Sequence, residues 1–121
     1  MSKYVKHQNL NDEYFFHEGC FITETSNSRD DDQASIVRAR VEPGQQTKWH
    51  WLENTFERYA IIAGHGEVEV GDETPREVTT GDIVIIPPGI KQRIRNSGET
   101  DLIFYAVCTP PFHPDNYNSE D

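Results

Sequence analysis

Hydrophobic and polar positions alternate in short runs along most of this chain. Runs rich in Val, Ile, Phe, Tyr and Thr are separated by Gly, Pro, Asn and Asp, which is typical of strands joined by turns. No window after residue 20 keeps a helical apolar period over the length of an ordinary helix. The pattern predicts strands at residues 20–25, 35–42, 49–52, 57–63, 66–70, 82–86, 91–96 and 101–109.

Many short strands with evenly spaced turns indicate an all-β sandwich or barrel. A chain of 121 residues has the size of one domain with a single core. We therefore expect one domain over residues 1–121, with its core at 20–109 and an extension at each end. Residues 4–18 fit either a short helix or an edge strand, and Phe112 and Tyr117 could hold the C-terminal extension against the barrel.

Two spaced patterns of glycine, proline and polar residues run through the predicted strands. The first is Gly44-x5-His50-x-Leu52-x4-Glu57-x6-Gly64, and the second is Gly81-x5-Pro87-x-Gly89-x2-Gln92-x3-Asn96. With both sets of spacings intact, the chain resembles the cupin family over roughly residues 35–108. The resemblance implies a double-stranded β-helix, or jelly-roll, barrel with a pocket inside.

Side chains alternate between the two faces of a strand, so the patterns can be assigned to an inner and an outer face. If His50 faces inward, the residues expected to face inward are His50, Leu52, Glu57, Tyr59, Ile61, Gln92, Ile94 and Asn96. On the family template His50, Glu57 and Gln92 converge inside the barrel. Asn96, at the end of its strand, is expected to have a structural role.

The resemblance implies a divalent metal ion (Mn, Fe, Ni, Co or Zn) bound by His50, Glu57 and Gln92. In the family pattern a histidine stands at the position of Leu52 and another at that of Gln92. An amide oxygen is a weak, neutral ligand, so this set would bind a metal less tightly than the usual one. The alternative is a pocket that has lost the metal and uses His50 and Glu57 as an acid–base or binding pair.

Tyr59 and Arg38 are candidate substrate-binding residues. Tyr59 offers a hydroxyl group, although a barrel-core aromatic fits the position equally well. Arg38 and Arg40 alternate with aliphatic residues, which favours the aliphatic side chains inside and the arginines outside. If the arginines instead face the pocket, they would bind a carboxylate or a phosphate.

The net charge of −10 and the pI of about 4.8 disfavour nucleic acid and anionic membranes as partners. The chain has no apolar run near the ~20 residues of a membrane-spanning helix. Its N-terminus lacks the features of a secretory signal, so we expect a cytoplasmic location. Cys20 and Cys108 lie in apolar runs and are expected to be buried, reduced thiols.

Three aromatic residues, Trp49, Trp51 and Phe56, could form an apolar patch, and small cupins often dimerise, so a homodimer is predicted. His113 could cover the mouth of the pocket. The expected ligand is a small molecule. The expected function is a metal-dependent reaction on a small polar metabolite, of oxygenase, decarboxylase, isomerase or lyase type. The alternative is a non-catalytic cupin that binds a sugar or a carboxylate.

Overall fold

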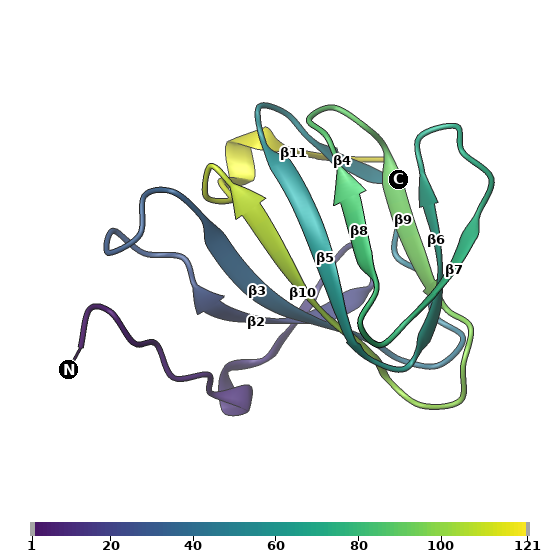
Figure 1. Ribbon diagram of the computed structural model, residues 1–121, viewed down its shortest axis with the longest axis horizontal. Helices are drawn as coiled ribbons and strands as arrows, with labels where there is room; N and C mark the ends of the chain where they lie inside the picture. Colours follow the sequence, from purple (N-terminus) through teal and green to yellow (C-terminus); the bar gives the residue numbers. More distant parts are fainter. Residues whose placement is uncertain (1, 121) are drawn as a thin grey trace.

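The computed structural model describes residues 2–120 and consists of two antiparallel β-sheets that face each other across a shared core (Figure 1). The six-stranded sheet has the order β1 (Tyr14–Phe16), β2 (Cys20–Ser26), β3 (Ser35–Val41), β10 (Leu102–Thr109), β5 (Phe56–Ala63), β8 (Ile83–Ile86). The five-stranded sheet has the order β11 (Tyr117–Ser119), β4 (His50–Leu52), β9 (Gln92–Asn96), β6 (His65–Val70), β7 (Arg76–Thr79). Two 3₁₀ helices flank them, η1 (Leu10–Asp12) and η2 (Pro114–Asn116).

The predicted all-β architecture is confirmed, and every predicted strand is present with bounds within about one residue. The strands β7 and β11 were not predicted. Each is only three or four residues long, and within β7 only Val78 is buried, so no alternation is visible. The segment 4–18 contains both of the expected alternatives, η1 and β1. No helix among residues 2–120 has the length and apolar character to cross a membrane.

The period of two along each strand sets which side chains fill the core. All the residues expected to face inward are buried, and Gln92 and Ile94 are fully inaccessible at 0% exposure. On β10 buried and half-buried residues alternate along the whole strand. The alternation read from the sequence therefore holds in both sheets, because burial on one face is the constraint that sets strand register.

Asn96 joins the two sheets at the end of the barrel where β9 finishes. Its side-chain amide donates to the carbonyl oxygens of Val41 and Thr100, each at 2.8 Å. Its carbonyl oxygen accepts the backbone N–H of Gly98 at 2.9 Å. With three of its hydrogen bonds made to backbone groups and 1% of its surface exposed, Asn96 has the structural role that the sequence predicts.

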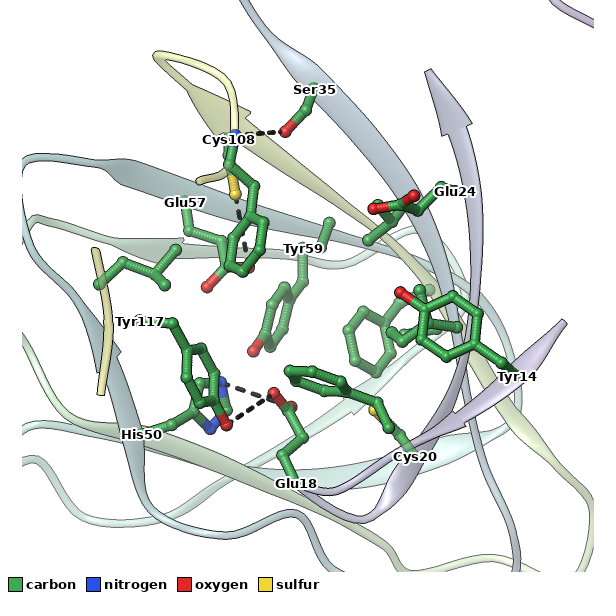
Figure 2. Close-up of a pocket in the computed structure, with 18 residues that line it drawn as sticks. Tyr14, Glu18, Cys20, Glu24, Ser35, His50, Glu57, Tyr59, Cys108 and Tyr117 are labelled. Atoms are coloured by element: carbon green, nitrogen blue, oxygen red, sulfur yellow. Dashed lines mark hydrogen bonds and ion pairs between the residues drawn. The ribbon is translucent and has the colours of Figure 1, made fainter. Parts of the chain in front are cut away.

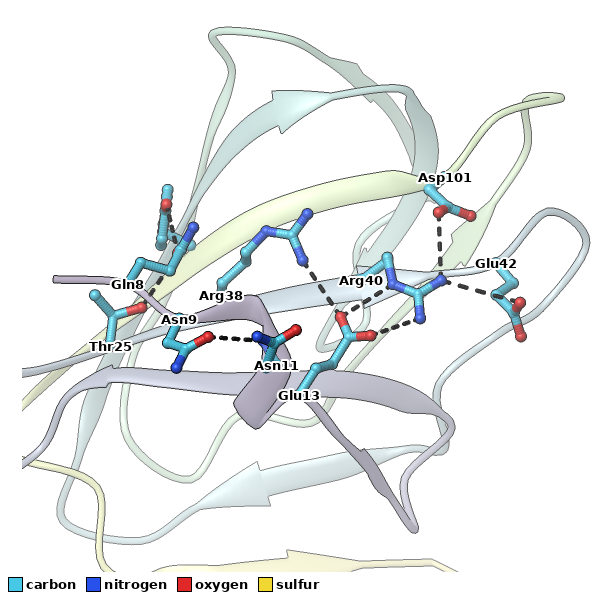
Figure 3. A network of polar contacts seen from close by, with 10 residues as sticks. Gln8, Asn9, Asn11, Glu13, Thr25, Arg38, Arg40, Glu42 and Asp101 are labelled. Atoms are coloured by element: carbon cyan, nitrogen blue, oxygen red, sulfur yellow. Dashed lines mark hydrogen bonds and ion pairs between the residues drawn. The ribbon is translucent and has the colours of Figure 1, made fainter.

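Arg38 and Arg40 lie on the outer face of β3 and bind the N-terminal segment (Figure 3). Glu13 Oε1 lies 2.7 Å from Arg40 Nη2, and Glu13 Oε2 lies 3.3 Å from Arg38 Nη1. The hydrogen bond from Arg40 lowers the pKa of Glu13. Arg40 also contacts Asp101 at 3.3 Å. The arginines therefore fasten the segment before β1 to the sheet.

The three aromatic residues of the predicted dimer patch are half-buried, and each ring lies under a cation. Arg93 covers Trp49 at 4.3 Å, Lys91 covers Trp51 at 5.3 Å and Arg58 covers Phe56 at 4.2 Å. Large exposed apolar residues lie instead on the six-stranded sheet, at Ile62 on β5 and at Ile83 and Ile85 on the edge strand β8. The homodimer stays a prediction.

A substitution at Gly64, between β5 and β6, tests how closely the chain packs where it crosses from one sheet to the other. Its φ is +87°, and a Cβ there would lie 2.6 Å from the Asp101 carbonyl oxygen. We expect Gly64→Ala to lower the free energy of unfolding by about 2–4 kcal/mol, from backbone strain and overpacking together. Gly81 is the matched control, since its φ is +95° but no atom lies within 4 Å of the added Cβ. Urea unfolding of both variants checks this; equal losses would show that the close approach at Gly64 is unimportant.

Candidate functional site

A cavity of about 80 Å³ lies between the two sheets, with room for several water molecules or a small organic molecule (Figure 2). Its walls are mostly aromatic and aliphatic, and they come from both sheets and the C-terminal segment. The polar and ionisable residues that line it are Tyr14, Glu18, Cys20, Glu24, Ser35, His50, Glu57, Tyr59, Cys108 and Tyr117. The site thus concentrates a few ionisable groups in an apolar surrounding.

His50 is held in one orientation and one tautomer. It is 3% exposed, and its Nδ1 lies 2.8 Å from the carbonyl oxygen of Lys48. A carbonyl can only accept, so Nδ1 carries the proton and Nε2 keeps its lone pair in the neutral ring. Burial lowers the pKa of His50 below its ordinary 6.5. The imidazole is therefore a neutral base at neutral pH, and the ring of Tyr117 stacks on it at 5.8 Å.

Glu18 faces the free nitrogen of His50. Its Oε2 lies 3.5 Å from His50 Nε2, and its Oε1 accepts the Tyr117 hydroxyl at 3.3 Å (Figure 2). Burial raises the pKa of Glu18 to about 7, against the smaller opposing effects of its hydrogen bonds to Tyr117 and Cys20. At neutral pH the carboxyl is therefore close to half-protonated, next to an acceptor nitrogen.

A second carboxyl, Glu57, ends a chain of buried hydrogen bonds. The Tyr59 hydroxyl donates to the carbonyl oxygen of Gln92, and the Gln92 amide donates to Glu57 Oε1 at 2.6 Å. The Cys108 thiol donates to Glu57 Oε2 at 3.7 Å. Burial raises the pKa of Glu57, while the nearby His50 and the Gln92 hydrogen bond oppose the rise. This carboxyl also favours its protonated form more than an exposed glutamate does.

The structure brings together the three residues for which the family resemblance implied metal binding. His50 pairs with Gln92 across β4 and β9, and Gln92 bonds to Glu57. The Gln92 oxygen that would bind a cation already accepts the Tyr59 hydroxyl, and Leu52 offers no ligand atom. Within residues 2–120 no group of three or more His, Cys, Asp or Glu side chains is arranged to hold a metal ion. As arranged, this donor set does not fit a divalent metal.

Of the two predicted substrate-binding residues, Tyr59 lines the cavity and Arg38 does not. Val37 and Ala39 of β3 face the cavity, which turns Arg38 to the outer face and its contact with Glu13. His113 is exposed and accepts the backbone N–H of Asp115 at the start of η2, so it does not cover the pocket. Cys20 and Cys108 are free, buried thiols, as expected.

Sequence reasoning missed Glu18 as a functional residue. Glu18 lies outside both motifs, in the turn between β1 and β2, where the next residue, Gly19, has a φ of +114°, and its side chain lines the cavity. Tyr117 was expected only to hold the tail against the barrel, yet it contacts both Glu18 and His50. The only signal for Glu18 in the sequence was an acidic residue beside a glycine, directly before an apolar strand.

The raised pKa of Glu18 gives a prediction for stability. A carboxyl whose folded pKa lies at about 7, above its ordinary 4.5, stabilises the fold below pH 4.5, and this contribution is lost as the pH rises through about 7. We expect Glu18→Gln, which cannot titrate, to gain stability relative to the unsubstituted protein over this range, by up to about 3 kcal/mol. Urea unfolding between pH 4.5 and 8 measures the difference. Glu24→Gln is the control for loss of one carboxyl, and parallel pH curves for Glu18→Gln and the unsubstituted protein would contradict the prediction.

Comparisons with curated proteins identify relatives that match part of the chain. An oxalate-binding protein of Thermotoga maritima is 35% identical over 73 residues, which are 60% of this chain and 59% of that protein. Protein SchB of Streptomyces halstedii is 32% identical over 75 residues, 60% of this chain and 54% of SchB. The chain thus spans somewhat more than half the length of these relatives.

Solved structures match nearly the whole chain. An uncharacterised protein with a double-stranded β-helix domain from Klebsiella pneumoniae has a TM-score of 0.75 at 20% identity, covering 92% of this chain and 93% of that one. A variant of Streptomyces Pac13 solved with uridine has a TM-score of 0.79 at 18% identity, covering 99% and 92%. At these identities the likeness shows the fold, and it confirms the double-stranded β-helix. The Cupin domain model matches residues 37–108, more than half of the chain, and the chain therefore belongs to the cupin family.

Proposed function

We propose that the pocket binds a small organic molecule and transfers protons on it, as an isomerase or lyase does. The observation that carries this proposal is the buried His50–Glu18 pair, in which a neutral imidazole nitrogen lies 3.5 Å from a carboxyl whose pKa is about 7. An acid and a base with these protonation states are matched to proton transfer near neutral pH. The apolar walls exclude bulk water and strengthen the interactions of the developing charges.

In this proposal His50 Nε2 is the base that removes a proton from a carbon or hydroxyl group of the substrate. Glu18 is the acid, and its proton goes to a carbonyl oxygen in an isomerisation or to a departing hydroxyl in an elimination of water. In the isomerisation His50 returns its proton to the neighbouring carbon, and Glu18 takes a proton back from the neighbouring hydroxyl, so that both groups are restored. In the elimination the proton that His50 has gained passes to Glu18. Tyr117 orients Glu18 through its hydroxyl, and Lys48 orients His50 through its carbonyl oxygen.

One relative supports the lyase type of reaction. Pac13, whose fold this chain shares, is described as a nucleoside dehydratase, and elimination of water needs an acid and a base on the two reacting groups. The similarity is at the level of fold, so the reaction is carried over only as a proposal. The oxalate-binding relative supports the broader proposal that the pocket binds a small molecule.

The metal-dependent enzyme predicted from the sequence is the second candidate. It is favoured by the convergence of His50, Glu57 and Gln92 at the positions that bind metals in other cupins. In it the Gln92 oxygen would bind the cation through its second lone pair, since the first accepts the Tyr59 hydroxyl. The third candidate is a pocket that binds a sugar or a carboxylate without catalysis. The cytoplasmic location also stays a prediction.

The role of His50 can be tested with a panel of candidate ligands. Small molecules, including uridine and oxalate, are screened for thermal stabilisation, and each ligand found is followed by NMR in D₂O for exchange or elimination. We expect a bell-shaped pH profile of kcat/KM, with its rising limb below 6.5 from His50 and its falling limb near 7 from Glu18. His50→Gln should lower the rate by roughly 10²–10⁴-fold while the ligand still binds.

The matched control for His50→Gln is His17→Gln. His17 contacts the ring of Tyr117 with centroids 5.5 Å apart but is exposed and does not line the cavity. Unchanged exchange in His50→Gln would refute the role of His50. A ligand that binds the unsubstituted protein with no exchange and no product would support the non-catalytic alternative.

Removal of metal separates the first two candidates. Because the proposed proton transfer uses only side chains of the chain itself, we expect the rate to be unchanged after dialysis against EDTA. Near-stoichiometric metal in protein purified without an affinity tag, its loss in His50→Ala and Glu57→Ala, and activity restored by Mn, Fe, Ni, Co or Zn would instead support the metal-dependent enzyme.

A further inference from the structure

We propose that the molecule bound in this pocket is a small organic cation, a protonated amine or a quaternary ammonium, held between Glu18 and Glu57 and the surrounding aromatic rings. The inference rests on the proposed function in one respect, since it concerns the ligand of the same cavity. It names the charge and chemical class of that ligand, which the reaction type leaves open.

The first observation is the charge of the cavity wall. Glu18, Glu24 and Glu57 line the cavity, whereas no lysine or arginine does so among residues 2–120. The arginines of β3 point to the opposite face of the sheet and pair with Glu13. An anion such as oxalate would therefore meet carboxyl groups with no cation to offset them, and the net charge of −10 opposes its approach.

The second observation is that two buried carboxyl groups lack a cationic side chain. Buried glutamates are normally paired with a cation or with a metal ion. Within the described chain, the partners of Glu18 are His50, Tyr117 and Cys20, and those of Glu57 are Gln92 and Cys108. None of these is a fixed positive charge. A bound cation would supply the missing partner to the ionised form of each carboxyl group, whereas the acid role of Glu18 belongs to its protonated form.

The third observation is the aromatic lining, which favours an organic cation over a metal ion. Six aromatic side chains line the cavity: Tyr14, Phe16, Tyr59, Phe104, Phe112 and Tyr117. Aromatic faces attract weakly hydrated cations, and alkyl groups of an amine or ammonium are compatible with the apolar walls. A divalent metal ion needs four or more ligand atoms in a defined geometry, which the described side chains do not provide.

Three compounds of the same shape test the proposal by charge alone. Choline carries a positive charge, 3,3-dimethylbutan-1-ol is its neutral carbon counterpart, and 3,3-dimethylbutanoate is a related anion. In calorimetric titrations at pH 7.5 we expect choline to bind at least about tenfold more tightly than the alcohol, and the anion not to bind measurably. Equal or tighter binding of the alcohol or the anion would overturn the proposal, as would failure of choline to bind.

Substitutions assign the binding to the two carboxyl groups. Glu18→Gln and Glu57→Gln should each weaken choline about tenfold or more and leave the affinity for the alcohol unchanged. Glu67→Gln is the control for net charge, since Glu67 pairs with Arg95 on the outer face of the second sheet. Choline affinity that is unchanged in both cavity variants, or that falls equally in Glu67→Gln, would overturn the proposal. Stoichiometric displacement of choline by Zn²⁺ or Mn²⁺ would overturn it in favour of a metal ion.

The choline experiments and the proton-transfer experiments can fail independently of each other. His50→Gln removes the base but neither carboxyl group, so it should lower the exchange rate by the same roughly 10²–10⁴-fold and retain choline binding. Loss of charge selectivity with His50-dependent exchange intact would refute the cation and leave the reaction standing. Selective choline binding without any exchange on a bound ligand would refute the reaction and leave the cation standing.

Discussion

The hydrogen bonds that Asn96 makes from one sheet to the other hold the closed end of the barrel, and the cavity depends on them. The Asn96 amide reaches the carbonyl oxygen of Val41 on the facing sheet, and Gly64 lets the chain cross between the sheets against the backbone at Asp101. At the opposite end, the C-terminal segment with Tyr117 packs beside β4. Backbone and amide contacts therefore join the two sheets at one end of the barrel, and side chains enclose the cavity at the other end.

Desolvation sets the chemistry of that space. The same burial lowers the pKa of His50 and raises those of Glu18 and Glu57, because each charged form loses its hydration. The groups differ in what they contact. His50 is oriented by a backbone carbonyl and Glu18 by a tyrosine hydroxyl, whereas Glu57 ends a chain through Gln92. The two carboxyl groups of one apolar cavity therefore differ in their hydrogen-bond partners, although burial raises the pKa of both.

The two residues that depart from the family pattern, Gln92 and Leu52, each have a clear place in the structure. Gln92 stands where a histidine ligand is usual, and both ends of its amide are used, one by Tyr59 and one by Glu57. Leu52 stands at another ligand position and forms part of the apolar wall. An amide that bridges a phenol and a carboxyl suits a polar network inside an apolar pocket, in which every buried group needs a partner.

The sequence by itself determined the strands from β2 to β10 except β7, their inner faces and the family, because alternation and turn spacing depend on neighbours along the chain. It placed His50, Glu57 and Gln92 on inward faces, which the structure bears out. Tertiary structure alone decided that Glu18 and Tyr117, 99 residues apart, meet beside His50, and that Arg38 turns outward to Glu13. These contacts require β1 to pair with β2 and β11 to pair with β4. The strands β1 and β11 are too short to show a pattern of their own. Their positions follow from the packing of the whole barrel, and the functional pocket is formed by that packing.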